Sequence, residues 1–221
     1  MAHRLKLIRA FSLSIALAAA GCSSEGPKTG STVEVDAAAA ANSLSSPRAP
    51  RRRNNPQVTL RTTLGEIIIE LDAQRAPRTV TNFLNYVEGG HYNNTIVHHV
   101  DAGYVALGGA YTPELAEKPG RYPIPNEAAN GRKNLRGTIA MARQLDAIDS
   151  STCQFFINLA DNPGLDHRGE GPDEYGFCVF GEVVEGLEVL DKLERVEVHG
   201  TAGFDKLPVE TVLIESARRL R

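Results

Sequence analysis

From Gln57 onwards the chain is a succession of short apolar segments, and this pattern limits its fold more than any other feature. Val58 and Leu60 alternate with polar neighbours, the turn at 63–65 follows, and then comes the β-branched run 67–69. Alternation with a period of two on both sides of a turn predicts a β-hairpin. Further apolar segments lie at 96–100, 104–107, 138–141, 154–158, 177–183 and 209–214, separated by Gly, Asn, Asp and Pro. Many short strands joined by turns predict an all-β barrel or sandwich.

Two segments carry the period of an amphipathic helix instead. The first begins with Pro77, a residue that suits the first helical position, and ends before Gly89. Its apolar residues recur at the spacing i, i+3, i+4 and i+7: Val80, Phe83, Leu84 and Val87. The second follows Gly186 and contains Leu187, Leu190 and Leu193. Two helices and about eight strands fit a closed barrel with a helix at each end, a form that leaves no sheet edge exposed.

The first 21 residues differ from the rest and have the features of an export signal. A basic start with Arg4, Lys6 and Arg9 precedes an apolar run from 10 to 20, which is too short to span a bilayer as a helix. The run ends in Ala-Ala-Gly before Cys22, which resembles the lipobox of bacterial lipoproteins, where the cysteine is lipidated and becomes the mature N-terminus. The alternative is an ordinary secretory signal with a chance cysteine. We expect a signal peptide at 1–21 and a lipid anchor on Cys22.

The expected location is therefore the cell envelope, with the protein held at a membrane and facing the periplasm. Ser23 and Glu25 do not resemble a retention signal of the inner membrane, which favours the outer membrane. Residues 22–55 are rich in Ser, Ala, Asn, Pro and Arg without an apolar period, and we expect a disordered tether there. Residues 56–218 then form one domain, which we expect to be monomeric. A net charge of -3 gives no reason to expect nucleic acid as a partner.

Six segments, in order and at compatible spacing, resemble the cyclophilin family of peptidyl-prolyl cis-trans isomerases. They are APRTVTNFL (76–84), GHYNNTIVHHV (90–100), GYVALGG (103–109), NLRGTIAMA (134–142), STCQFFI (151–157) and FCVFGEV (177–183). The resemblance extends over about 57–215. It implies a closed eight-stranded antiparallel β-barrel with two capping helices, and isomerisation of X-Pro bonds in proline-containing polypeptides without a metal or an organic cofactor.

The resemblance also assigns site residues. It implies a pocket for the proline ring, hydrogen-bonding groups that hold the adjacent backbone, and an aromatic ring over the rim. By motif the pocket consists of Tyr104, Val105, Phe156 and Leu165, with Met141 behind it. The peptide-holding groups are Gln154 and the backbone of Ala142 and Arg143, and Tyr175 is the candidate for the rim.

The chain departs from the family pattern at the catalytic position. The family's catalytic arginine falls at His99, and the glutamine that supports it falls at Leu107. Neutral histidine has one donor where arginine has five, and leucine has none. We therefore expect weak isomerase activity that rises as His99 becomes charged. Gly164 stands where the family has an aromatic residue beside the pocket, and this puts inhibition of the cyclosporin type in doubt.

Three alternatives remain open at this stage. A non-catalytic module that binds proline peptides would keep the pocket and lack the donor. His91, His98, His99 and His167 raise the question of a metal site, but adjacent histidines on a strand point to opposite faces, and we expect no metal. Cys153 and Cys178 fit two buried packing thiols, and a disulfide between them is the other option in an oxidising envelope.

Overall fold

The computed structural model describes residues 55–201 and 203–220, which form a closed antiparallel barrel with the strand order β1-β10-β3-β4-β6-β5-β7-β2. Cys22, the predicted signal peptide and almost all of the predicted tether lie outside the described residues. The barrel strands are β1 (Gln57–Thr62), β2 (Gly65–Leu71), β3 (Thr95–Asp101), β4 (Val105–Gly108), β5 (Thr138–Met141), β6 (Phe155–Asn158), β7 (Val179–Glu185) and β10 (Leu213–Arg219). The predicted eight-stranded barrel is confirmed.

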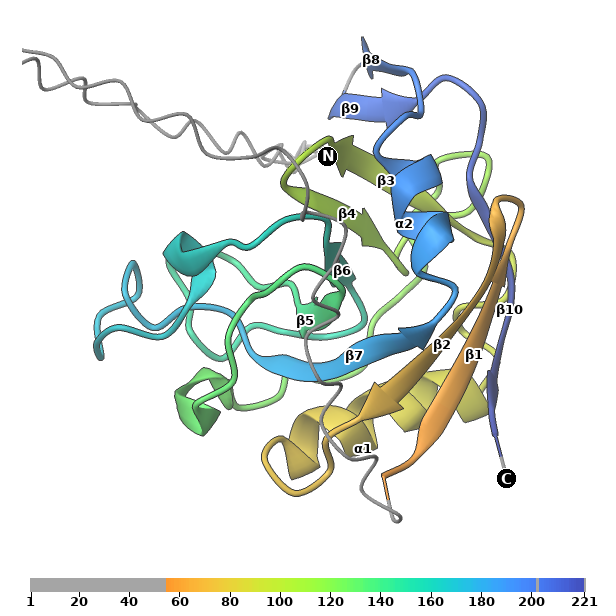
Figure 1. Cartoon of the computed structure of the whole chain (residues 1–221). Helices are drawn as coiled ribbons and strands as arrows, with labels where there is room; N and C mark the ends of the chain where they lie inside the picture. The colour runs from red at the N-terminus through yellow and green to blue at the C-terminus, as the bar shows by residue number, and fades with distance from the viewer. Residues whose placement is uncertain (1–54, 202, 221) are drawn as a thin grey trace, which may run out of the picture.

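Both predicted helices are present, α1 (Pro77–Glu88) and α2 (Leu187–Leu193). In Figure 1, α1 lies across the lower end of the barrel and α2 lies toward the other end. Phe83 of α1 reaches the interior, where its ring centroid lies 5.1 Å from that of Tyr92 and 5.1 Å from that of Phe180. The helix therefore closes the barrel with its apolar face, as its periodicity predicts. Two short 3-10 turns, Ala128–Asn130 and Pro163–Leu165, lie in the connections.

The N-terminus of α1 receives its cap from a distant residue. Ala76 at the N-cap position has no side chain that can accept a hydrogen bond. Glu127 accepts instead, from the backbone N–H of Arg78 (3.2 Å) and from the N–H and hydroxyl of Thr79 (2.9 and 2.7 Å). A carboxylate at this end satisfies unpaired N–H groups and interacts favourably with the helix dipole.

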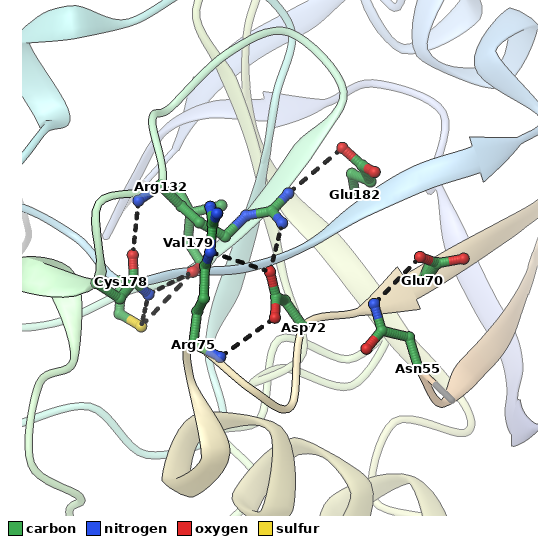
Figure 2. Close-up of polar contacts among 9 residues, drawn as sticks. Asn55, Glu70, Asp72, Arg75, Arg132, Cys178, Val179 and Glu182 are labelled. Atoms are coloured by element: carbon green, nitrogen blue, oxygen red, sulfur yellow. Dashed lines mark hydrogen bonds and ion pairs between the residues drawn. The ribbon is translucent and has the colours of Figure 1, made fainter. Parts of the chain in front are cut away.

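Arg132 connects three parts of the barrel surface, as Figure 2 shows. Its guanidinium donates to Oδ2 of Asp72, the residue directly after β2, at 2.8 Å. It also donates to the carboxylate of Glu182 in β7 at 3.3 Å. Burial by itself would raise the pKa of Asp72, but the hydrogen bonds and charges of Arg132 and Arg75 outweigh it, so the pKa lies below its usual value. This pairing holds the connection at 131–137 against β7.

The sequence did not predict a second small sheet, the hairpin of β8 (Val198–Thr201) and β9 (Phe204–Pro208). It stands above β3 at the top of Figure 1. The last barrel strand begins at Leu213, later than the predicted start at 209.

Cys153 and Cys178 are buried free thiols, so the structure contains two buried packing thiols and no disulfide between them. Among the residues that the structure describes, no helix is long and apolar enough to cross a membrane.

Candidate functional site

The outer face of the barrel carries an apolar cluster that is separate from the core inside it. Its buried members are Val105, Ala140, Phe156 and Val179, and its partly buried members are Tyr104, Leu107, Ala142, Leu165 and Phe177. We call these nine residues the outer cluster. They come from β4, β6, β5 and β7, which are neighbours in the barrel, and from the adjoining connections. Outward-facing strand positions are usually polar, so an apolar group of this kind is a candidate binding surface.

The strand register explains how the outer cluster forms. Across the sheet His99 pairs with Leu107, Leu107 with Phe156, Phe156 with Ala140, and Ala140 with Val179. Residues directly opposite one another in antiparallel strands project from the same face. These five residues therefore form one continuous row on the outside of the barrel, with an imidazole at one end and apolar side chains along the rest.

The structure brings together most of the residues that the sequence assigned to a pocket. Tyr104, Val105, Phe156 and Leu165 all belong to the outer cluster. Met141 does not, because it is the neighbour of Ala140 on β5 and so points to the other face, into the barrel core, with 1% of its surface exposed. Met141 therefore lies behind the outer cluster, on the core side of β5, and its part in substrate binding stays a prediction.

Tyr175, the candidate for the rim, is not a member of the outer cluster. Tyr175 packs against the barrel core and against the ring of His167, with the ring centroids 5.0 Å apart. Phe177 lies in the outer cluster instead, 5.6 Å from the ring of Phe156 in an edge-to-face arrangement. The sequence contained a signal for this, because Phe177 and Val179 are two residues apart in an extended segment and therefore share a face.

Gln154 and Ala142 lie at the edge of the outer cluster. Gln154 is partly exposed and precedes Phe156 by two residues in the extended segment, which places both on one face. The backbone N–H of Ala142 donates to the Gln154 carbonyl at 3.0 Å. This N–H is therefore occupied, and a bound peptide can meet the backbone of Ala142 only through its carbonyl oxygen.

Arg143 is 5% exposed, and its guanidinium has a structural task that the sequence did not indicate. It donates to the backbone carbonyls of Gly176 (2.9 Å), Gln144 (2.9 Å), Leu145 (3.0 Å) and Pro172 (2.5 Å). Its central carbon also lies 5.0 Å from the centroid of the Phe177 ring. The side chain thus holds two loops beside the outer cluster, and only the backbone of Arg143 is left to hold a peptide.

A chain of buried amides fixes the opposite side of the outer cluster. Asn162 donates to the Tyr104 carbonyl at 2.9 Å and to Asn158 Oδ1 at 2.7 Å. Asn158 in turn donates to Asn134 Oδ1 at 3.2 Å, and Asn134 donates to the Leu165 carbonyl at 3.0 Å. Tyr104 and Leu165 are therefore linked through hydrogen bonds. Buried networks whose groups are all satisfied rigidify their surroundings, which suits a preformed pocket.

His99 is half-buried, and burial lowers the pKa of its imidazole below the ordinary value. Asp101 and Asp205 act in the opposite direction, and Lys206 acts in the same direction as burial. The net result is a side chain that is neutral at neutral pH and offers a single N–H donor. Its neighbour across the strand pair is Leu107, which cannot orient the ring through a hydrogen bond.

No group of three or more His, Cys, Asp or Glu side chains in the described part of the chain is arranged to hold a metal ion. The register of β3 shifts between Val97 and His99, so strict alternation of faces does not hold there, and His98 packs against Tyr111 and Phe204, with ring centroids 4.8 and 6.0 Å away. His99 lies at the end of the row on the outside of the barrel, next to Leu107. The side chains present on the outer face can bind an apolar group and donate a hydrogen bond beside it.

Comparison with known proteins agrees with this geometry. Residues 57–219 match the family described as cyclophilin type peptidyl-prolyl cis-trans isomerase. The chain is 46% identical to peptidyl-prolyl cis-trans isomerase B of Escherichia coli over 159 residues, which cover 72% of this chain and 96% of that protein. It is 44% identical to peptidyl-prolyl cis-trans isomerase A of Dickeya dadantii over 164 residues, which cover 74% and 84%.

A similar solved structure is a cyclophilin type peptidyl-prolyl cis-trans isomerase of Cryptosporidium parvum, determined in the presence of the dipeptide Ala-Pro. It has a TM-score of 0.64 and 25% identity, and the match covers 75% of this chain and 99% of that one. The barrel, the outer cluster and these relatives lead to one assignment: the chain belongs to the cyclophilin type family of peptidyl-prolyl cis-trans isomerases.

Proposed function

We propose that this protein isomerises X-Pro peptide bonds of exported proteins on the outer cluster, with His99 as the side-chain donor. The observation that carries the proposal is the continuous row from His99 through Leu107 and Phe156 to Val179. This row puts one hydrogen-bond donor at the end of an apolar surface that suits a proline ring. The names of the relatives and the Ala-Pro dipeptide used with one of them support the same reaction.

The chemistry requires little beyond such a surface. Rotation about a peptide bond has a barrier of about 18 to 20 kcal/mol because twisting destroys the amide resonance. For X-Pro the two end states differ by only about 0.5 to 1 kcal/mol, so the catalyst has to stabilise the twisted bond alone. Phe156 and Leu165 would hold the proline ring, Gln154 and the backbone beside it would hold the peptide, and His99 would meet the rotating carbonyl oxygen.

The rate should be low for this family because the donor is weak. Loss of one preorganised donor at a developing charge costs about 2.7 to 4 kcal/mol, which is about 100- to 1,000-fold in rate. His99 keeps one donor at neutral pH and gains a second together with a charge when it is protonated. Since burial lowers its pKa, the rise in activity should occur on the acid side of the ordinary histidine value.

The test measures cis-to-trans exchange of an Ala-Pro peptide by NMR, with the full chain in a mild detergent at pH 5, 6 and 8. His99→Ala and His99→Arg are measured beside the parent. Exchange above background that rises toward pH 5, falls in His99→Ala and increases in His99→Arg would support the proposal. Peptide binding without faster exchange in the parent would instead leave a proline-recognition module, and a flat pH profile would remove His99 as the donor.

We also propose that a lipid on Cys22 holds the domain in the cell envelope. The support is the basic start, the short apolar run and the small residues before the only cysteine in the first 150 residues. The test is incorporation of radiolabelled palmitate into the parent and into Cys22→Ser in a bacterial host. Label in the parent alone would support the anchor, and a parent that is cleaved and released without label would contradict it.

A further inference from the structure

The β8–β9 hairpin has no role in the barrel sheet, but it is packed firmly onto the strand that carries His99. Phe204 at the start of β9 lies edge-on to Tyr111, with a centroid distance of 5.0 Å, and edge-on to His98 of β3 at 6.0 Å. Figure 1 shows the hairpin next to β3, at the end of the barrel away from α1. These aromatic contacts fix the position of the residues that follow Phe204.

One of those residues is Lys206, whose ammonium lies on the outer face beside His99. Lys206 Nζ is 2.6 Å from Asp101 Oδ1. Asp101 is two residues from His99 along β3 and pairs in register with Val105 of the outer cluster. Asp101 and His99 therefore project from the same face. The hairpin thus delivers a cation to the His99 end of the row.

The ion pair leaves part of the ammonium free to act. Lysine has three N–H donors, of which Asp101 takes one. The Lys206 side chain is 40% exposed, so the group is not enclosed by protein. The charged groups that face His99 are Asp101 from its own strand and Asp205 and Lys206 from β9. Among these, Lys206 is the one that can donate a hydrogen bond to an anionic or carbonyl oxygen.

We propose that Lys206 is a second catalytic residue, whose ammonium donates a hydrogen bond to the carbonyl oxygen of the X-Pro bond as the bond twists. This inference rests on the proposed isomerase function of the outer cluster. A cation at this position supplies what His99 lacks when it is neutral, namely a positive charge next to the developing negative charge. Asp101 then acts as a positioning residue that holds the ammonium over β3.

The test compares Lys206→Met with Lys206→Arg by NMR exchange of an Ala-Pro peptide at pH 8, where His99 is uncharged. We expect Lys206→Met to lower kcat/KM by at least about 10-fold while peptide affinity changes by less than about 2-fold. Lys206→Arg should keep most of the activity because it retains a charged donor. Lys192→Met is the matched control, since Lys192 of α2 is an exposed lysine whose ammonium donates to the Leu64 carbonyl at 2.7 Å.

Each outcome decides the question. A partly exposed ion pair contributes little to stability, so Lys206→Met should fold, and thermal melting verifies this. If it does not fold, Lys206→Gln, whose side chain is slightly shorter, polar and uncharged, takes its place. If the parent is active and the uncharged Lys206 variant is equally fast, the proposed role of Lys206 is wrong. The same holds if Lys192→Met loses as much activity as the Lys206 variant. Neither result would affect the proposed isomerase function. A parent without any acceleration would overturn the isomerase function itself.

Discussion

The environment of His98 predicts that this protein loses stability in mild acid through one side chain. His98 is 6% exposed, and its ring packs against the rings of Tyr111 and Phe204, which also contact each other. Its Nδ1 atom is buried and has no hydrogen-bond partner among the described residues. Burial, together with the neighbouring His99, lowers the pKa of His98 to about 4, and the Ile96 backbone offsets this only in part.

Proton linkage gives the sign and the size of the change in the free energy of unfolding with pH. Between the ordinary histidine pKa of 6.5 and about 4, the unfolded chain binds a proton at this position and the folded protein does not. The free energy of unfolding therefore decreases as the pH falls through this interval, and the loss is complete below about pH 4. A difference of two to three pKa units corresponds to about 3 kcal/mol, a large share of the roughly 5 to 15 kcal/mol that stabilises a typical domain.

The assay is urea denaturation of the full chain between pH 4 and 8, with His98→Phe as the comparison. Phenylalanine keeps the ring contacts and removes the titrating group. The parent should lose about 3 kcal/mol more than His98→Phe between pH 7.5 and 4. His91 and His99 also have lowered pKa values, but they are present in both proteins, so their contributions largely cancel. Parallel curves for the two proteins would refute the reasoning.

Three further predictions concern binding and folding. Phe177→Ala should weaken binding of an Ala-Pro peptide by about 10-fold with little change in melting temperature, because Phe177 covers the outer cluster and not the barrel core; titration calorimetry checks this. Glu127→Gln should lower the free energy of unfolding by about 1 kcal/mol in urea denaturation, since it removes the charge that caps α1. Gly186→Ala should lower the free energy of unfolding by more than about 3 kcal/mol, because Gly186 has φ 83° and a Cβ there would lie 2.2 Å from the Glu66 carbonyl oxygen. Gly131→Ala is the control: Gly131 has φ 78° but open space around it, so this change should cost only about 1 kcal/mol. Equal losses in the two variants, measured by urea denaturation, would contradict the steric argument.

The predicted elements that depend on local pattern agree with the structure. The hairpin of β1 and β2, the helix α1 from Pro77 and the short helix after Gly186 all follow from periodicity and turn residues within a few positions. The β8–β9 hairpin was missed because Val198–Thr201 is exposed along its whole length, and an exposed strand has no alternating apolar pattern. Its fixed position comes instead from Phe204, whose partners His98 and Tyr111 are distant in sequence.

The candidate site was predicted in part, for a related reason. Motif order grouped Tyr104, Val105, Phe156 and Leu165, and the structure brings the four together in one apolar cluster, while their role as a proline pocket stays a prediction. The structure adds that Met141 lies on the core side of β5, because adjacent residues of a strand face opposite sides and a motif does not state which side is inside the barrel. Motif order also did not indicate that Tyr175 packs against the barrel core, in a loop with its own internal hydrogen bonds such as Tyr175 N–H to the Gly171 carbonyl at 2.8 Å.

The sequence by itself determined the class of fold, the helices and the family, because local patterns and motifs of consecutive residues indicate each of them. It also predicts that His99 takes the place of the family's catalytic arginine. Only the tertiary structure decided which side chains share the outer face, since that depends on the register between strands. It also decided that Lys206 lies beside His99, because barrel closure and the packing of Phe204 bring β9 onto β3. Contacts between distant residues have no local signature, and they determine where the charges of this site lie.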